Sequence, residues 1–150
     1  IPDNVKNAII RKPELISASP TDKIAVYAAA EGGNGFMIVS TDAIDYVSRP
    51  SILENINDGY GIYVVGESMV PLYRPGDVLL VHPKLPPVRD GRFVFYQTGA
   101  DGDVLATVKE LVSWNNTTWH VRQHNPPREF DLDRSEWPIC HRVVGTYERR

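Results

Sequence analysis

Short apolar segments separated by turn residues recur along most of this 150-residue chain. The connections between them are rich in proline, glycine, asparagine and aspartate, which favour turns and interrupt regular structure. Short strands with such frequent turn signals predict a mainly β domain, not strands and helices alternating around a parallel sheet. The strand-like segments are residues 23–30, 36–40, 60–65, 77–82, 92–97, 103–112, 117–123 and 139–147.

Three parts of the chain lack this pattern. Residues 1–22 have no sustained period and contain several prolines, so we expect a linker or N-terminal extension before a domain at 23–150. Residues 41–56 mix polar and apolar positions, and we expect a short helix there that Pro50 interrupts. Residues 125–138, NPPREFDLDRSEWP, are interpreted as a connection between strands.

Composition and charge narrow the functional classes. Hydrophobic residues make up 42% of the chain and charged residues 23%, as in ordinary globular domains. The net charge of −3 gives no basic footprint for nucleic acid, so we do not expect these residues to contact DNA. No apolar run approaches the roughly 18 residues that span a bilayer, and there is no signal-peptide layout, so no membrane partner is expected.

Cysteine and histidine usage gives two further expectations. Cys140 is the only cysteine, which excludes an internal disulfide and suits a reducing cytoplasm. The four histidines have no metal-ligand spacing, so neither a metal nor another cofactor is expected.

The stretch VVGESMVPLYRPGDVLLVHP, residues 64–83, places one serine between a strand-like segment and a turn. Glycine and serine are common before turns, so Ser68 can be an ordinary turn residue. Alternatively, Ser68 is a nucleophile held at the end of a strand. A serine hydroxyl is a poor nucleophile until a base removes its proton, so this second interpretation requires a partner.

Histidine and lysine are the candidate bases. None of the four histidines lies in a recognisable setting, and a Ser-His-Asp triad is defined by geometry, not by sequence. A lysine base must be buried among apolar residues, because its ordinary pKa keeps it protonated at neutral pH. Lys109 fits, since period-2 counting in DVLATVKELVSW places it on one face with Leu105 and Leu111. Otherwise Lys109 faces water from an edge strand, with its stem packed along its neighbours.

The two segments together resemble the LexA-like repressor autoproteases, the family that includes the phage CI repressors. In GESMVPLYRPGDVLLVHP, the matching residues are Gly66, Glu67, Ser68, Met69, Pro71, Gly76 and Asp77. ATVKELV resembles the family's strand with the general-base lysine, which Lys109 matches 41 residues after Ser68. VRQHNPPREFDL and HRVVGTY resemble its closing strands, so that the likeness covers about residues 23–150.

The resemblance implies a LexA/signal-peptidase-like fold of several short, coiled β-sheets. It implies that Ser68 attacks a peptide carbonyl of the chain's own loop and that neutral Lys109 accepts its proton. Backbone N–H groups at Ser68 and Met69 would stabilise the oxyanion and position the substrate. It further implies a homodimer, DNA binding through an N-terminal helix-turn-helix domain missing before Ile1, and a RecA filament as a candidate co-protease. We expect the final strand, HRVVGTY, to contribute to the dimer.

One departure from the family pattern concerns the cleaved bond, typically Ala-Gly or Cys-Gly some 35 residues before the serine. That position falls in AAAEGG, and the candidate cleavage residues are Ala30, Glu31, Gly32 and Gly33. Neither an Ala-Gly nor a Cys-Gly pair occurs in the chain. Two alternatives therefore stay open: a binding or dimerisation module that retains the dyad without cleaving, and a signal-peptidase-like enzyme. Against the latter, the chain has no membrane anchor and the lysine strand has no paired basic residue.

Overall fold

The computed structural model describes residues 22–31, 35–99 and 101–147, and the expected extension at residues 1–21 lies outside them. Nine strands and one short 3-10 helix, η3, make up this part of the chain. Their bounds are β1 Lys23–Glu31, β2 Met37–Ser48, η3 Ser51–Leu53, β3 Tyr60–Tyr63, β4 Val78–His82, β5 Arg92–Thr98, β6 Val104–Trp114, β7 Thr118–His124, β8 Pro127–Asp133 and β9 Ile139–Tyr147. The expected mainly β class is confirmed.

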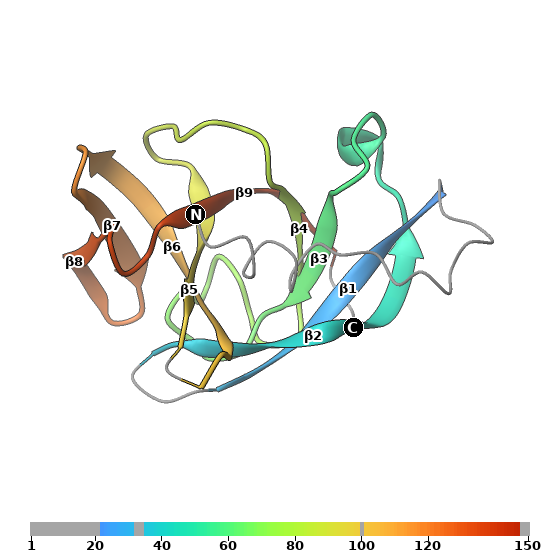
Figure 1. The fold of residues 1–150 in the computed structure, drawn as a ribbon, viewed down its shortest axis with the longest axis horizontal. Helices are drawn as coiled ribbons and strands as arrows, with labels where there is room; N and C mark the ends of the chain where they lie inside the picture. The colour runs from blue at the N-terminus through green and yellow to red at the C-terminus, as the bar shows by residue number, and fades with distance from the viewer. Residues whose placement is uncertain (1–21, 32–34, 100, 148–150) are drawn as a thin grey trace.

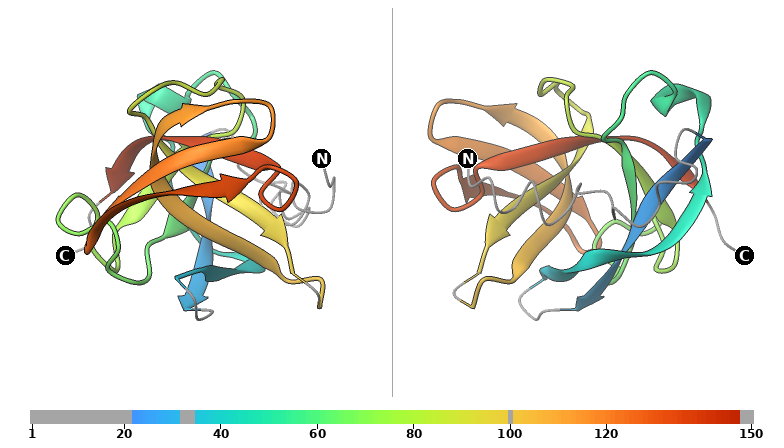
Figure 2. Two further views of the ribbon diagram at one scale, coloured as in Figure 1. Left: turned by 90° about the vertical axis from the view of Figure 1, so that its left-hand side faces the viewer. Right: turned by 45° about the vertical axis from the view of Figure 1, so that its right-hand side comes forward.

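All nine strands join into one mixed sheet in the order β2-β1-β3-β4-β9-β5-β6-β7-β8. Only the β1–β3 pair is parallel within this described sheet. Figure 1 shows β5–β8 gathered at one end and β1–β4 at the other, with β9 crossing between them. The sheet curls until β2 also pairs with β6, Met37 opposite Ala106, as the further views in Figure 2 show. This closure brings the β1–β2 hairpin beside the strand that carries Lys109.

Two expectations about secondary structure are wrong. The helix expected within residues 41–56 is instead the second half of β2, followed by η3. A short helix is only marginally stable on its own, whereas antiparallel pairing with β1, from Lys23 opposite Ser48 onward, anchors this segment to the sheet. The connection expected at residues 125–138 contains β8, which pairs with β7 along its whole length.

Two main groups of buried side chains lie on the two faces of the sheet around β5 and β6. The first includes Val104, Ala106 and Val108 of β6, and the second includes Leu111, with Leu105 packed against it. The period-2 assignment of faces along β6 is therefore confirmed. Both faces are covered, which explains how a strand next to the site can hold a lysine out of water.

The last strand, β9, is an interior strand of the sheet, whereas β8 lies at its edge. The first half of β9 pairs with β5 and its second half with β4. The unpaired sheet edge that a dimer would cover therefore lies at β8 and not at β9. In the part of the chain that the structure describes, no helix has the length and apolar character needed to cross a membrane.

Candidate active site

Ser68 lies in the loop between β3 and β4, and the base of this loop is closed by backbone hydrogen bonds. The N–H of Val64 donates to the carbonyl of Asp77 at 2.9 Å, and the N–H of Gly76 donates to the carbonyl of Val64 at 3.0 Å. Gly66 and Gly76 have φ angles of 80° and 94°, a region that side-chain-bearing residues rarely adopt. The two glycines of the sequence motif thus let the chain turn sharply on either side of Ser68.

Lys109 projects from β6 toward this loop, and the residue is only 3% exposed. Its Nζ donates a hydrogen bond to the Oγ of Ser68 at 3.1 Å and a second one to the carbonyl of Val108 at 3.1 Å. The distance between Nζ and Oγ lies within the reach required of a serine and its base. The hydrogen bond to Val108 helps to fix the position of the amine, and this favours its contact with Ser68.

The surroundings of Lys109 favour its neutral form. Burial, with a smaller contribution from the nearby guanidinium of Arg128, lowers the pKa of Lys109 to about 8. Burial dominates because an ammonium group loses its hydration among the apolar neighbours of β6. A substantial fraction of Lys109 is therefore unprotonated at mildly alkaline pH, as a general base must be.

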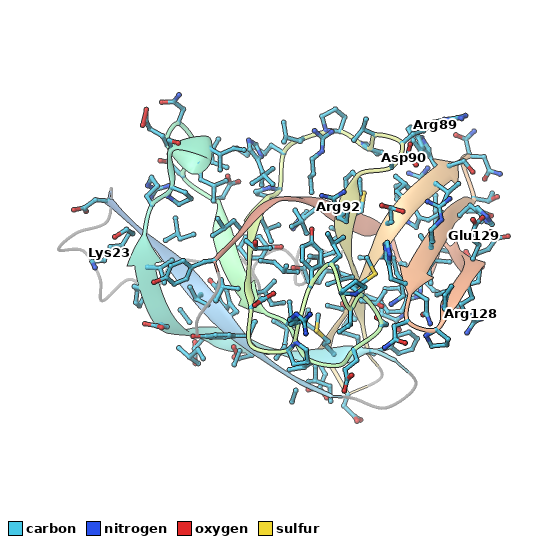
Figure 3. The ribbon with its side chains drawn as sticks, turned by 180° about the vertical axis from the view of Figure 1, so that it is seen from behind. Lys23, Arg89, Asp90, Arg92, Arg128 and Glu129 are labelled. Carbon is cyan, nitrogen blue, oxygen red and sulfur yellow. The ribbon has the colours of Figure 1, made fainter. Side chains whose placement is uncertain are left out.

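Arg128 reaches the neighbourhood of Lys109 across the outer strands of the sheet. The β6–β7 register, continued by one residue, places Gln123 opposite Lys109, and Gln123 pairs with Arg128 on β8. The three side chains therefore share one face. Figure 3 shows Arg128 on the β7–β8 hairpin, where its guanidinium also stacks over the ring of Phe130 at 4.4 Å.

A small pocket adjoins Ser68, and the β1–β2 hairpin forms part of its wall. Gly35, in the turn before β2, and Met37, the first residue of β2, line this pocket together with Ser68 and Thr107. The hydroxyl of Thr107 donates to the carbonyl of Gly35 at 3.5 Å. The segment that follows the candidate cleavage residues is therefore already in contact with the serine's surroundings.

The candidate cleavage residues are only partly described. Ala30 is exposed and pairs with Ile38, and the backbone of Glu31 pairs with Met37, so both lie within the β1–β2 ladder. Gly32 and Gly33 lie outside the described residues. Both residues of the candidate Ala30–Glu31 bond are therefore held by pairing with β2.

Ser68 and Met69 both line the small pocket. Among the described residues, neither the N–H of Ser68 nor that of Met69 has a hydrogen-bond partner. The carbonyl of Ser68, in contrast, accepts the N–H groups of His124 and Asn125, each at 2.8 Å. The Nδ2 of Asn125 also donates to the carbonyl of Glu67 at 3.2 Å. Apart from the Asn-Pro turn itself, nothing in the sequence indicates these contacts.

No histidine side chain is hydrogen-bonded to Ser68 in the described ranges. The imidazole of His124 lies on the other face of β7, with Nε2 3.9 Å from a carboxylate oxygen of Glu110. His141 is buried and hydrogen-bonded through Nδ1 to the hydroxyl of Tyr60 at 2.7 Å. The geometry thus favours the lysine over a histidine as the partner of Ser68.

Comparison with known proteins identifies the family. The Peptidase S24-like family matches residues 25–144, which include both Ser68 and Lys109. The chain is also 33% identical, over 144 residues, to the Repressor protein C of Rhizobium phage 16-3. That alignment covers 92% of this chain but 54% of the relative, so the chain spans about half the length of that protein. The expected likeness to LexA-like repressors is confirmed, and the chain belongs to the Peptidase S24-like family.

Proposed function

We propose that this chain is the regulatory, self-cleaving domain of a phage-type transcriptional repressor, with Ser68 as nucleophile and Lys109 as general base. The single observation that supports it most is the buried Nζ of Lys109, 3.1 Å from the Oγ of Ser68. A lysine is rarely buried in an apolar interior unless it is paired with another group or has a functional role. Here the pKa of Lys109 is lowered, so a larger fraction of its amine is neutral near physiological pH and able to accept a proton.

In the proposed reaction, the Oγ of Ser68 attacks the carbonyl carbon of a peptide bond while its proton passes to neutral Lys109. The N–H groups of Ser68 and Met69 stabilise the oxyanion of the tetrahedral intermediate. Protonated Lys109 then gives the proton to the departing amine, which leaves an ester on Ser68. Water hydrolyses this ester with Lys109 acting again as base, and the free serine is restored.

The proposed substrate is the chain's own hairpin, at a bond within residues 30–33. Support comes from Gly35, which lines the pocket beside Ser68 only a few residues after that segment. Because Ala30 and Glu31 are paired with β2, the reaction must include opening of the hairpin end. This opening supplies a point at which an inducer, such as the expected RecA filament, would control the rate.

The repressor context rests on the family and on the relative's name. The relative is a phage repressor about twice as long as the matched region. A DNA-binding helix-turn-helix domain attached to this one, and a homodimer that presents two such readers to a palindromic operator, would complete the function. A chain with net charge −3 suits this division, in which another domain contacts DNA.

A second candidate function is a dimerisation or binding module that retains the dyad without cleaving. It is favoured by one observation: Ala30 is followed by Glu31, and no Ala-Gly or Cys-Gly bond occurs in the chain. Cleavage after Ala30 would carry the carboxylate of Glu31 into an apolar site, and burying an unpaired charge is costly.

The replacement Glu31→Gly separates the two candidates, because it removes this charge and creates an Ala-Gly bond. Wild type, Glu31→Gly and Glu31→Gly/Ser68→Ala are incubated at pH 7 and pH 10, and the intact mass is followed. The proposal predicts that Glu31→Gly is cleaved faster than wild type, more so at pH 10, and that the added Ser68→Ala abolishes cleavage. If Glu31→Gly stays whole at pH 10 while folded, the module without cleavage takes the proposal's place.

A further inference from the structure

The turn between β7 and β8 makes three hydrogen bonds to the serine loop, which lies more than 50 residues away in the sequence. Backbone N–H groups of His124 and Asn125 both donate to the carbonyl of Ser68, and the side-chain amide of Asn125 donates to the carbonyl of Glu67. Both accepting carbonyls belong to the peptide units that flank the nucleophile. No other turn in the described residues makes several bonds to this loop.

These two carbonyls determine where the flanking N–H groups point. A trans peptide unit is planar, with its N–H directed opposite to its C=O. The peptides that join Glu67 to Ser68 and Ser68 to Met69 are both trans. Holding the carbonyls of Glu67 and Ser68 toward the β7–β8 turn therefore directs the N–H groups of Ser68 and Met69 away from it. These are the two donors that have no partner among the described residues.

The turn is itself fixed to the strand that carries Lys109. The guanidinium of Arg122, on β7, binds the carboxylate of Glu110 at 2.7 Å, and Glu110 directly follows Lys109 on β6. The side-chain amide of Gln123 donates to the carbonyl of Pro126 at 3.0 Å, which closes the turn. One rigid hairpin thus sets the position of the serine backbone relative to the lysine.

We propose that Asn125 is a positioning residue that orients the N–H groups of Ser68 and Met69 as an oxyanion-binding pair. This inference rests on the proposed self-cleavage and adds the residue that builds its anion site. Asn125 touches no reacting atom. Its amide and the N–H groups beside it hold the two peptide planes so that both donors are in place before the oxyanion forms, which is what makes such donors effective.

The inference is tested in the Glu31→Gly chain by adding Asn125→Ala or Asn125→Asp, of which the second keeps the shape but loses the donor. The matched control is Asn115→Ala, because Asn115 also stabilises a hairpin turn, accepting the N–H groups of Thr117 and Thr118 at 2.9 Å, but makes no contact with Ser68. Self-cleavage rates are measured from pH 6 to pH 10. Amide ¹H–¹⁵N spectra are recorded in the Ser68→Ala background, where no cleavage intervenes.

Both Asn125 variants are expected to lower the plateau rate by roughly tenfold, less than the loss of a whole oxyanion donor. The midpoint of the pH profile should stay where it is in the parent, since Lys109 is untouched. The amide resonances of residues 68 and 69 should shift in the Asn125 variants and not in Asn115→Ala.

Three outcomes overturn the inference, and they differ from failure of the proposed function. If Glu31→Gly is cleaved and the Asn125 variants are cleaved at the same plateau rate, Asn125 does not position the donors. If the rate falls equally in Asn115→Ala, the effect is one of general stability. If the rate falls while the two amide resonances stay unchanged, Asn125 acts by another route. A Glu31→Gly parent that never cleaves removes the proposed function and this inference together.

Discussion

Burying Lys109 should cost this protein stability at neutral pH, and replacing it with methionine should recover that stability. Methionine has a similar length and no charge, so it fills the same space between β6 and the serine loop. The pKa of Lys109 is lowered from its ordinary 10.5 to about 8. A shift of this size corresponds to about 3 kcal/mol of unfavourable free energy for the charged form in the folded state, at about 1.4 kcal/mol per pKa unit.

The stability cost of burying Lys109 depends on pH. A base whose pKa is lower in the folded state binds more protons when unfolded, so stability rises with pH. The penalty is complete below pH 8, decreases as the pH rises and vanishes above the unfolded pKa of 10.5. Between pH 7 and pH 9, wild type should therefore gain roughly 1 kcal/mol relative to Lys109→Met. The variant also loses the hydrogen bonds to Ser68 and Val108, worth about 1 kcal/mol each, but this loss is constant across the interval.

Urea unfolding of wild type and Lys109→Met at pH 7, 8 and 9 measures this difference. Lys23→Met is the matched control. Lys23 is exposed and lies at the opposite end of the molecule from Arg128 (Figure 3), so its replacement should not change how stability varies with pH. The reasoning is refuted if the stability difference between wild type and Lys109→Met stays constant from pH 7 to pH 9. It is equally refuted if wild type loses stability relative to the variant as the pH rises. Lys109→Met should also be unable to cleave itself, so the same residue that costs stability carries the proposed activity.

Three further predictions follow from the neighbouring contacts. Arg128→Gln should raise the pKa of Lys109, and only slightly, because an exposed cation is partly screened; a ¹³C titration of the lysine Cε measures this change, and an unchanged midpoint would show that Arg128 does not contribute to the lowered pKa. Gly61→Ala should destabilise the fold by about 1–3 kcal/mol, since the added methyl would lie 2.8 Å from Val78, and an unchanged urea midpoint would contradict that crowding. The carboxylates of Asp131 and Glu129 raise the pKa of His120, so its pairing stabilises the fold at low pH and is lost as the pH rises through that raised pKa. His120→Gln should therefore destabilise the protein at pH 5.5 by less than about 1 kcal/mol and have less effect at pH 9; equal urea midpoints for the variant and wild type at pH 5.5 would argue against it.

Strands with a local apolar pattern could be predicted from the amino-acid sequence, and so could Ser68 and Lys109 as candidate site residues. Side chains along β6 alternate between the two faces of the sheet, so counting every second residue predicts the face on which Lys109 lies. The serine motif was recognisable for the same reason: its glycines and its turn lie within a few residues of one another. Pairing over long distances was not predictable in this way. The second half of β2 and all of β8 have no clear strand pattern in the sequence, and they form strands because a partner strand is available.

The assembly of the site depends on the folded sheet. The Nζ of Lys109 meets the Oγ of Ser68 because the curled sheet brings β6 against the β3–β4 loop, an approach that no spacing of 41 residues specifies. The bonds from Asn125 to the serine loop depend on the same curvature, together with the exact reach of the β7–β8 hairpin. The lowered pKa of Lys109 likewise comes from surroundings contributed by several strands. Local pattern thus selects which residues can act, whereas distance, burial and orientation exist only once the sheet has closed, because each depends on segments that are remote in the sequence.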